Sequence, residues 1–178
     1  MTPSVRSRWI LPLGLAAVPA FHAAWATQYL SLAEAQQAMF ADADAFRALP
    51  PVDTVLAAEL GGAGWTPQLF EAVKGGTRLG WFMVDRVIGK TELITYALAL
   101  DANGAVKAIE ILDYRETHGS EVRLAAWRRQ FVGKTARDAV ELDRDIKGIS
   151  GATLSTRHVT EGVHRLLQLH QRALLAAG

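Results

Sequence analysis

The chain has 178 residues, of which 19 are Lys or Arg and 18 are Asp or Glu, giving a formal net charge of +1. This balance lacks the excess positive charge of nucleic-acid-binding domains, so we expect no nucleic-acid partner. The sequence contains no cysteine, which excludes disulfides, cysteine-ligated iron–sulfur clusters, c-type haem attachment and thiol catalysis. Any redox chemistry would need a cofactor held in another way.

The first 26 residues have the three parts of an export signal. Arg6 and Arg8 precede an apolar run over residues 10–21, and Ala24-Trp25-Ala26 has the small-x-small pattern of a cleavage site. The run contains two prolines and is shorter than the roughly 20 residues that span a bilayer, so an uncleaved membrane anchor is the weaker alternative. We therefore predict that residues 1–26 are a secretory signal peptide.

Cleavage would remove two arginines and leave 17 basic residues against 18 acidic ones. Residues 27–178 are long enough for one domain with its own core, and no repeat or linker divides them. The sequence thus predicts a single domain in the periplasm or another extracytoplasmic compartment.

The first part of this domain predicts one clear helix. Ser31-Leu32-Ala33-Glu34 has the pattern of a capping box, and the helix that follows should end near Asp42. Residues 52–60 fit a strand or a helix equally well, and residues 61–64, with three glycines, predict a turn.

The middle of the sequence predicts three strands. They cover residues 81–87, 92–100 and 106–112, where apolar side chains recur at strand spacing. Between the last two, Asn103 and Gly104 should supply the positive φ angles of a tight hairpin turn.

The last third predicts three helices. The first should begin at Ser120 and bury Leu124, Trp127 and Phe131 on one face. Residues 134–142 suggest a shorter second helix. The third has apolar residues at intervals of three and four, at Val159, Val163, Leu166, Leu167, His170 and Leu174. Because strands and helices do not alternate regularly, we expect an α+β fold with a largely antiparallel sheet and packed helices.

Residues 150–155, just before the last helix, read Ser-Gly-Ala-Thr-Leu-Ser. Gly151 and Ala152 let a bulky group approach the backbone, and Thr153 offers a hydroxyl that could be esterified. A phosphate there would meet the N-terminus of the helix, which favours anions. The same residues could instead form only a helix start, since Ser and Thr are preferred N-caps.

This run resembles the flavinylation motif of the FMN-binding domain family, which includes the C subunit of the sodium-pumping NADH:quinone reductase and the G subunit of the Rnf complex. The resemblance implies that a flavin transferase moves FMN from FAD onto Thr153 as a phosphoester. The cofactor would also contact the other residues of the motif, namely Ser150, Gly151, Ala152, Leu154 and Ser155.

Two further elements support the resemblance, which covers residues 80–175. Residues 116–119, Glu-Thr-His-Gly, resemble the family's Glu-Thr-Pro-Gly, and residues 130–134, Gln-Phe-Val-Gly-Lys, resemble its Gln-Phe-x-Gly-Lys. His118 stands where many relatives have proline, and the aspartate upstream of the motif, Asp145, lies farther away than usual. The first element implies that Tyr114, Glu116, Thr117 and Gly119 contact the flavin ring, although the same residues could instead only shape the loop at the end of a strand.

Other sites have weaker support. Ser155 is a rival hydroxyl for the attachment, although its simplest role is to cap the last helix or to bond a phosphate oxygen.

The three histidines of the last helix do not suggest a metal site. His158, His164 and His170 are spaced by six, which does not suit a helical metal site. We expect His164 at the surface and His170 half-buried. Gly133-Lys134-Thr135 lacks the upstream glycine of a phosphate-binding loop, which argues against nucleotide hydrolysis.

These features predict an exported flavoprotein that carries covalent FMN and relays electrons between membrane or periplasmic redox proteins. One alternative is a secreted flavin-dependent reductase of a small substrate, for which the sequence offers only Arg115 and Glu116 as orienting groups. Another is a periplasmic ligand-binding domain without redox function, in which residues 150–155 only start a helix.

Overall fold

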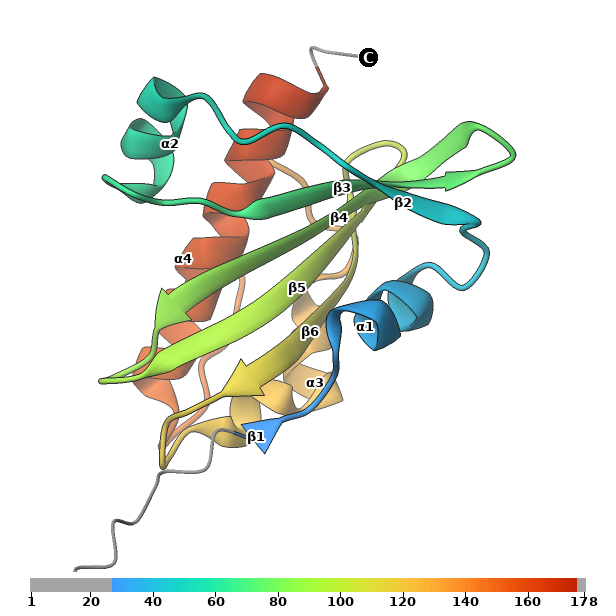
Figure 1. Ribbon diagram of the computed structural model, residues 1–178. Helices are drawn as coiled ribbons and strands as arrows, with labels where there is room; N and C mark the ends of the chain where they lie inside the picture. Colours follow the sequence, from blue (N-terminus) through green and yellow to red (C-terminus); the bar gives the residue numbers. More distant parts are fainter. Residues whose placement is uncertain (1–26, 176–178) are drawn as a thin grey trace, which may run out of the picture.

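The computed structural model describes residues 27–175 (Figure 1). The predicted signal peptide lies outside this range. Among the described residues, no helix has the length and apolar character needed to cross a bilayer.

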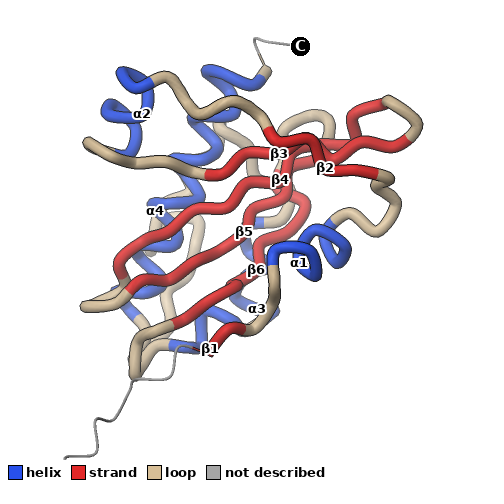
Figure 2. Tube along the Cα trace, viewed as in Figure 1, coloured by secondary structure: helices blue, strands red, loops and turns tan. Residues whose placement is uncertain are grey.

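A six-stranded antiparallel sheet forms the centre of the molecule, with the strand order β1-β6-β5-β4-β3-β2 (Figure 2). The strands are β1 (Thr27–Gln28), β2 (Ala45–Ala48), β3 (Gln68–Lys74), β4 (Thr77–Ile88), β5 (Leu93–Asp101) and β6 (Val106–Tyr114). The predicted α+β class with an antiparallel sheet is confirmed.

Helices cover both faces of this sheet. Helix α1 (Leu32–Met39) lies on one face, while α3 (Ala125–Arg128) and α4 (Thr153–Leu169) lie on the other (Figure 1). Helix α2 (Thr54–Gly61) lies beside α4. The last turn after α4, His170–Leu174, is a π-helix.

Alternation along β4 divides the core into two layers. Trp81 and Met83 are buried in the larger cluster with the apolar face of α4. Phe82 and Val84 are buried in the smaller cluster under α1. A strand with both faces covered reads as a continuous apolar run, which explains why β4 is recognisable from sequence.

The N-terminal part agrees with the prediction in its first helix and in the turn at residues 61–64, where α2 ends at Gly61 and Gly62 and Gly64 have positive φ angles. Ser31 and Glu34 form the predicted capping box, but α1 ends at Met39 rather than near Asp42. Residues 52–60 are largely helical, because the Asp53 side chain accepts hydrogen bonds from the first backbone N–H groups of α2. The sequence did not predict β2 or β3.

The predicted β5–β6 hairpin is present, but its turn differs in detail. Gly104 has a φ of 81°, whereas Asn103 is not among the described residues with positive φ, so the prediction for Asn103 is wrong. Asp101 explains the difference, since its carboxylate accepts the backbone N–H groups of Asn103 (2.9 Å) and Ala105 (3.0 Å) and closes the turn from one side.

The two helices expected after β6 are not formed as predicted. Ser120 begins a 3₁₀ turn and does not cap it, since the N-cap is Gly119. Leu124 has an extended ψ of 121°, which separates this turn from α3 and leaves its side chain 55% exposed. Trp127 and Phe131 are buried as predicted.

Residues 134–142 form turns rather than the predicted short helix. Asp138 accepts hydrogen bonds from both the backbone N–H and the hydroxyl of Thr135. Val140 has a φ of 43°, which no helix tolerates. Side-chain bonds to the backbone compete with helix formation here, as Asp, Thr and Ser commonly do.

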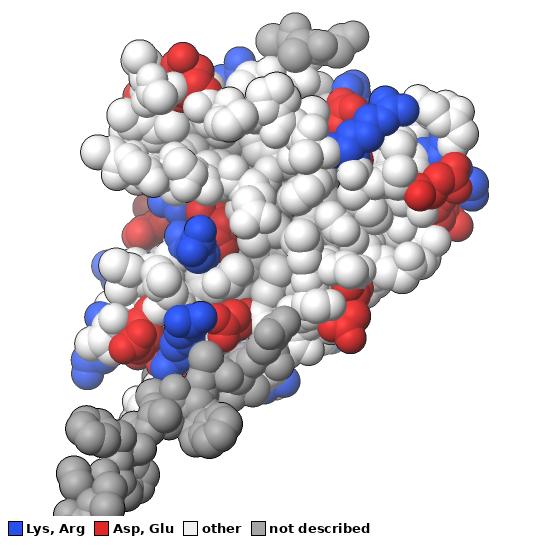
Figure 3. Space-filling view, in the orientation of Figure 1, with Lys and Arg blue, Asp and Glu red and all other residues white. Residues whose placement is uncertain are grey.

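On the face seen in Figure 3, acidic and basic side chains are interspersed, and a broad area between them carries no charge. The surface therefore shows no single-sign patch on that side.

Candidate functional site

Thr153 is the first residue of α4 and is exposed. Val159, Val163 and Leu166 are fully buried on the opposite side of the helix, so packing of α4 on the sheet turns Thr153 toward solvent. A Cβ atom placed on Gly151 would meet nothing within 4 Å. The space beside the hydroxyl is therefore open to a bulky group.

The start of α4 suits an anion. Its N-cap is Ala152, no side chain caps it, and no acidic residue lies in its first turn. The first N–H groups of a helix have no partner within the helix and carry the positive end of its dipole. A phosphate on Thr153 would thus be stabilised by backbone donors.

Ser155 lies in a different environment from Thr153. It is only 4% exposed, and its Oγ lies 3.0 Å from the phenolic oxygen of Tyr114. Ser155 is the third residue of α4 and not its N-cap, so the predicted capping role is wrong. Instead, its hydroxyl ties the first turn of α4 to the end of β6.

The loop after β6 packs against this helix turn. Gly119 has a φ of 89°, and a Cβ there would lie 2.7 Å from the Tyr114 oxygen and 2.8 Å from the Ser155 oxygen. Only glycine fits this contact. The Tyr114 hydroxyl also donates to the carbonyl of His118, and burial raises the pKa of this phenol. The structure thus brings Tyr114 and Gly119 next to residues 152–155.

Glu116 faces the β4–β5 turn. Its carboxylate accepts backbone N–H groups from Lys90, Thr91 (2.5 Å) and Glu92 (2.8 Å). Partial burial acts to raise the pKa of Glu116, but these hydrogen bonds outweigh it and lower the pKa. Thr117 is exposed and bonds the neighbouring His118 ring at 2.9 Å. Glu116 thus positions the turn at residues 89–92.

His158 holds the same turn from the side of α4. Its Nδ1 lies 2.6 Å from the carbonyl oxygen of Ile88 and 2.8 Å from that of Gly89. Nδ1 must carry a proton to donate to these acceptors, which leaves Nε2 free. Sequence analysis missed this role because the partners lie 69 and 70 residues away.

The other histidines do not form a site with His158. His164 is partly buried, whereas His170 is 2% exposed and not half-buried as predicted. Within residues 27–175, no group of three His, Asp or Glu side chains could hold a metal ion.

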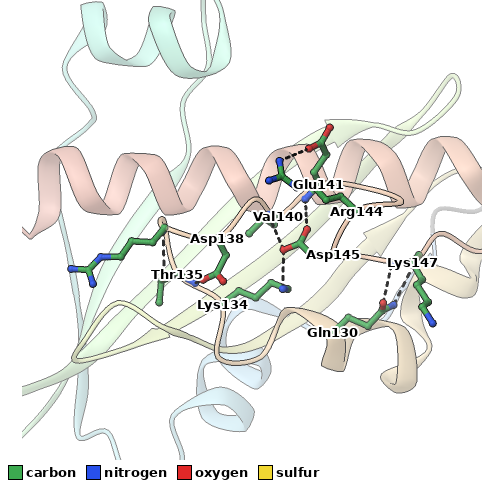
Figure 4. A network of polar contacts seen from close by, with 10 residues as sticks. Gln130, Lys134, Thr135, Asp138, Val140, Glu141, Arg144, Asp145 and Lys147 are labelled. Atoms are coloured by element: carbon green, nitrogen blue, oxygen red, sulfur yellow. Dashed lines mark hydrogen bonds and ion pairs between the residues drawn. The ribbon is translucent and has the colours of Figure 1, made fainter.

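The residues of the Gln-Phe-x-Gly-Lys element anchor the loop that leads to residues 150–155 (Figure 4). Gln130 accepts the backbone N–H of Lys147 at 2.8 Å, and Lys134 forms an ion pair with Asp145 at 2.8 Å. Asp145 also accepts the backbone N–H groups of Val140 (3.1 Å) and Glu141 (2.8 Å). Burial acts to raise the pKa of Asp145, but Lys134 and these N–H groups lower it overall.

Comparisons with known proteins show which family the sequence resembles. Residues 89–168 match the sequence model of the FMN-binding domain. Over 92 residues the chain is 28% identical to the G subunit of the Na(+)-translocating ferredoxin:NAD(+) oxidoreductase complex of Acetobacterium woodii, a match that covers 47% of this chain and 43% of that protein. The chain thus spans less than half the length of this relative.

The matched region includes all three motifs recognised in the sequence, at residues 116–119, 130–134 and 150–155. The resemblance drawn from these motifs is confirmed, since residues 89–168 match the FMN-binding domain.

Proposed function

We propose that this domain carries FMN covalently, as a phosphoester on Thr153, and that the flavin relays electrons between redox proteins. The observation that carries the proposal is the exposed hydroxyl of Thr153 at the uncapped first residue of α4, within a Ser-Gly-Ala-Thr run of an FMN-binding domain. Ser155, the rival hydroxyl, is buried against Tyr114.

Attachment is a phosphoryl-group transfer from FAD, catalysed by a flavin transferase. Oγ1 of Thr153 forms a bond to the phosphorus atom of the FMN half, the bond between that phosphorus and the bridging oxygen breaks, and AMP leaves. The hydroxyl proton is released. The resulting diester keeps one negative charge, which the first backbone N–H groups of α4 stabilise.

The proposed role as an electron carrier follows from the cofactor and from the relative. An isoalloxazine ring accepts and donates electrons, while the protein supplies attachment and orientation. The Acetobacterium woodii protein is, by its name, a subunit of an oxidoreductase complex. By analogy, the partners of this chain are membrane or periplasmic redox proteins.

The predicted export signal fits covalent attachment. Outside the cytoplasm a dissociating cofactor is diluted and lost, whereas an esterified flavin is retained at any dilution. We therefore place the flavin-loaded domain in the periplasm or another extracytoplasmic compartment.

The test is coexpression with a flavin transferase, followed by denaturation, desalting and intact-mass measurement. The wild-type protein should be heavier by one FMN less one water. Thr153→Ala should lose this addition and keep its circular dichroism, because Thr153 contributes little buried surface. Ser155→Ala is the matched control and should keep the flavin. A Thr153→Ala protein that still carries FMN would contradict the proposal.

A further inference from the structure

A cavity of about 600 Å³ lies between α4, the end of β4 and the loop after α2. Its walls come from two parts of the chain. His158, Glu161 and Arg165 of α4 belong to the region that matches the FMN-binding domain, whereas Trp65 and Asp85 precede that region. The volume is within the range typical of small-molecule sites.

Asp85 holds two walls of the cavity in place. This carboxylate is 4% exposed and accepts hydrogen bonds from Trp65 Nε1 (2.8 Å), the Tyr96 hydroxyl (3.0 Å) and Arg165 (2.6 Å). The Arg165 guanidinium also lies 4.9 Å from the centre of the Trp65 ring. A buried ion pair adds little net stability, but this one fixes an aromatic ring and a cation at a cavity wall.

The loop backbone is shaped around the same ring. A Cβ at Gly61 would lie 2.2 Å from atoms of the Trp65 indole, so the chain passes directly against it. The π-helix after α4 is also tied to α2, because Arg172 forms hydrogen bonds with both carboxylate oxygens of Glu59 at 2.7 and 2.8 Å. The cavity is thus preformed and not a gap between loose segments.

The polar groups of the cavity place a hydrogen-bond donor, Arg165, beside an acceptor, Glu161. Glu161 and Arg165 are one turn apart on α4 and therefore lie on the same face. Both line the cavity; Glu161 is exposed, and the Arg165 side chain is 20% exposed. His158 adds its free Nε2, since Nδ1 is bonded to the turn after β4.

A planar ring with an imide edge fits these groups. Such an edge presents a carbonyl oxygen, which Arg165 can bond as donor, beside a ring N–H, which Glu161 can bond as acceptor. Trp65 is 9% exposed, and Arg165 lies over its ring, so the part of the indole that lines the cavity offers an aromatic border to the ring. An isoalloxazine ring has this edge and this shape.

We propose that this cavity binds the isoalloxazine ring of a flavin, with Trp65 against the ring and Glu161 and Arg165 at its imide edge. The ring has two sources: the FMN on Thr153, which rests on the function proposed above, or a free flavin. His158 lies five residues after Thr153, about 7 to 8 Å along the helix axis, a rise that the five-carbon ribityl chain can bridge.

The first experiment uses protein whose FMN load has been verified by intact mass. An indole in contact with a flavin quenches its fluorescence, so Trp65→Phe should raise the emission at least twofold. Trp81→Phe is the control, because Trp81 is buried beside His170 and does not line the cavity. Circular dichroism checks that both variants are folded.

The second experiment uses the Thr153→Ala protein and added riboflavin, which lacks the phosphate and cannot be attached. If the cavity takes a free flavin, riboflavin should bind with quenched fluorescence. Glu161→Ala should weaken this binding at least tenfold. Because Glu161 is exposed, this substitution leaves the fold intact. Glu141→Ala, an exposed acid on the loop across α4, should not weaken binding.

Higher emission from the loaded Trp65→Phe protein would assign the cavity to the ring of the FMN on Thr153. Riboflavin binding to the Thr153→Ala protein would assign it to a free flavin. The inference would be overturned if Trp65→Phe left the flavin fluorescence of the loaded protein unchanged and the Thr153→Ala protein did not bind riboflavin. Covalent attachment would be unaffected by these two results. Wild-type protein without any FMN addition would overturn the proposed function, and the riboflavin experiment would then decide the cavity alone.

Discussion

Thr153 and Ser155 show how burial separates two residues that look alike in sequence. Both hydroxyls belong to the run at residues 150–155, the proposed attachment motif, and lie two positions apart. Thr153 is exposed, whereas Ser155 is only 4% exposed. A transferase can reach the first without disturbing the fold. To reach the second, it would have to break the contact with Tyr114 and open the packing around Gly119.

His170 should make stability depend on pH. Burial, with a smaller contribution from Arg78, lowers its pKa from 6.5 to about 4. Between these values the unfolded state binds a proton that the folded state does not, so this contribution to stability is complete above pH 6.5 and falls as the pH decreases. We expect a loss of roughly 2 kcal/mol between pH 7 and pH 5.

Urea unfolding at both pH values measures this loss. His170→Leu removes the titrating group and should reduce the difference between the two pH values by most of that amount. An identical pH dependence in the variant and the wild type would show that His170 is not responsible.

At the scale of elements, Asp145 holds the loop between the Gln-Phe-x-Gly-Lys element and the attachment motif. Asp145→Asn should weaken the bonds to Lys134, Val140 and Glu141 and destabilise the fold by about 2 kcal/mol, the typical value for hydrogen bonds to a charged group. Urea unfolding at pH 7 is the measurement. Asp143→Asn is the control, because Asp143 is exposed and Asn tolerates its φ of 65°. Equal stability of the two variants would contradict this role.

The loop at residues 114–119 should hold the turn at residues 89–92. Replacing Glu116 and Thr117 with alanine should leave covalent loading intact but release the turn at residues 89–92. Losing bonds of about 1.5 to 3 kcal/mol should speed amide exchange there at least tenfold. The resemblance also implies that these two residues contact the flavin ring; losing a bond of this size to the reduced ring alone would shift the reduction potential of a one-electron couple by tens of millivolts.

Hydrogen-exchange mass spectrometry and potentiometric titration of the loaded double variant test these two expectations. Glu121→Ala is a suitable control, since Glu121 is exposed in the following 3₁₀ turn. Unchanged exchange at residues 89–92 would show that Glu116 does not hold the turn.

The elements that could be predicted from sequence are those whose pattern is local. Strands β4 to β6 and helix α4 have regular apolar spacing, and α1 has its capping box. The contacts of Glu116 and His158 with the β4–β5 turn join segments between 24 and 70 residues apart, so no local pattern shows them. The helix predicted over residues 134–142 fails because Asp138 and Asp145 bind its backbone instead.

The region that matches the FMN-binding domain and the residues that precede it supply different parts of the proposed site. The attachment motif, its supporting loops and α4 lie within residues 89–168. Strand β4, the loop after α2 and Trp65 precede this region and close the cavity beside α4. The cavity therefore depends on both parts.

Export should be required for flavin attachment. A chain that starts at Thr27 behind an initiator Met should fold, because the described sheet and helices lie within residues 27–175. In cells whose transferase acts outside the cytoplasm, this protein should remain without FMN. Fusing it to an unrelated export signal should restore loading. Full loading of the cytoplasmic form would show that export is not needed.

Peptide mapping of the loaded wild-type protein shows which residue carries the flavin. Trypsin cleaves after Lys147 and Arg157, so residues 148–157 form one peptide that contains Ser150, Thr153 and Ser155. We expect that this peptide carries one FMN and that its fragment ions place the flavin on Thr153. A flavin on Ser155 or on another peptide, or a fully unmodified peptide 148–157 from transferase-treated protein, would contradict this expectation.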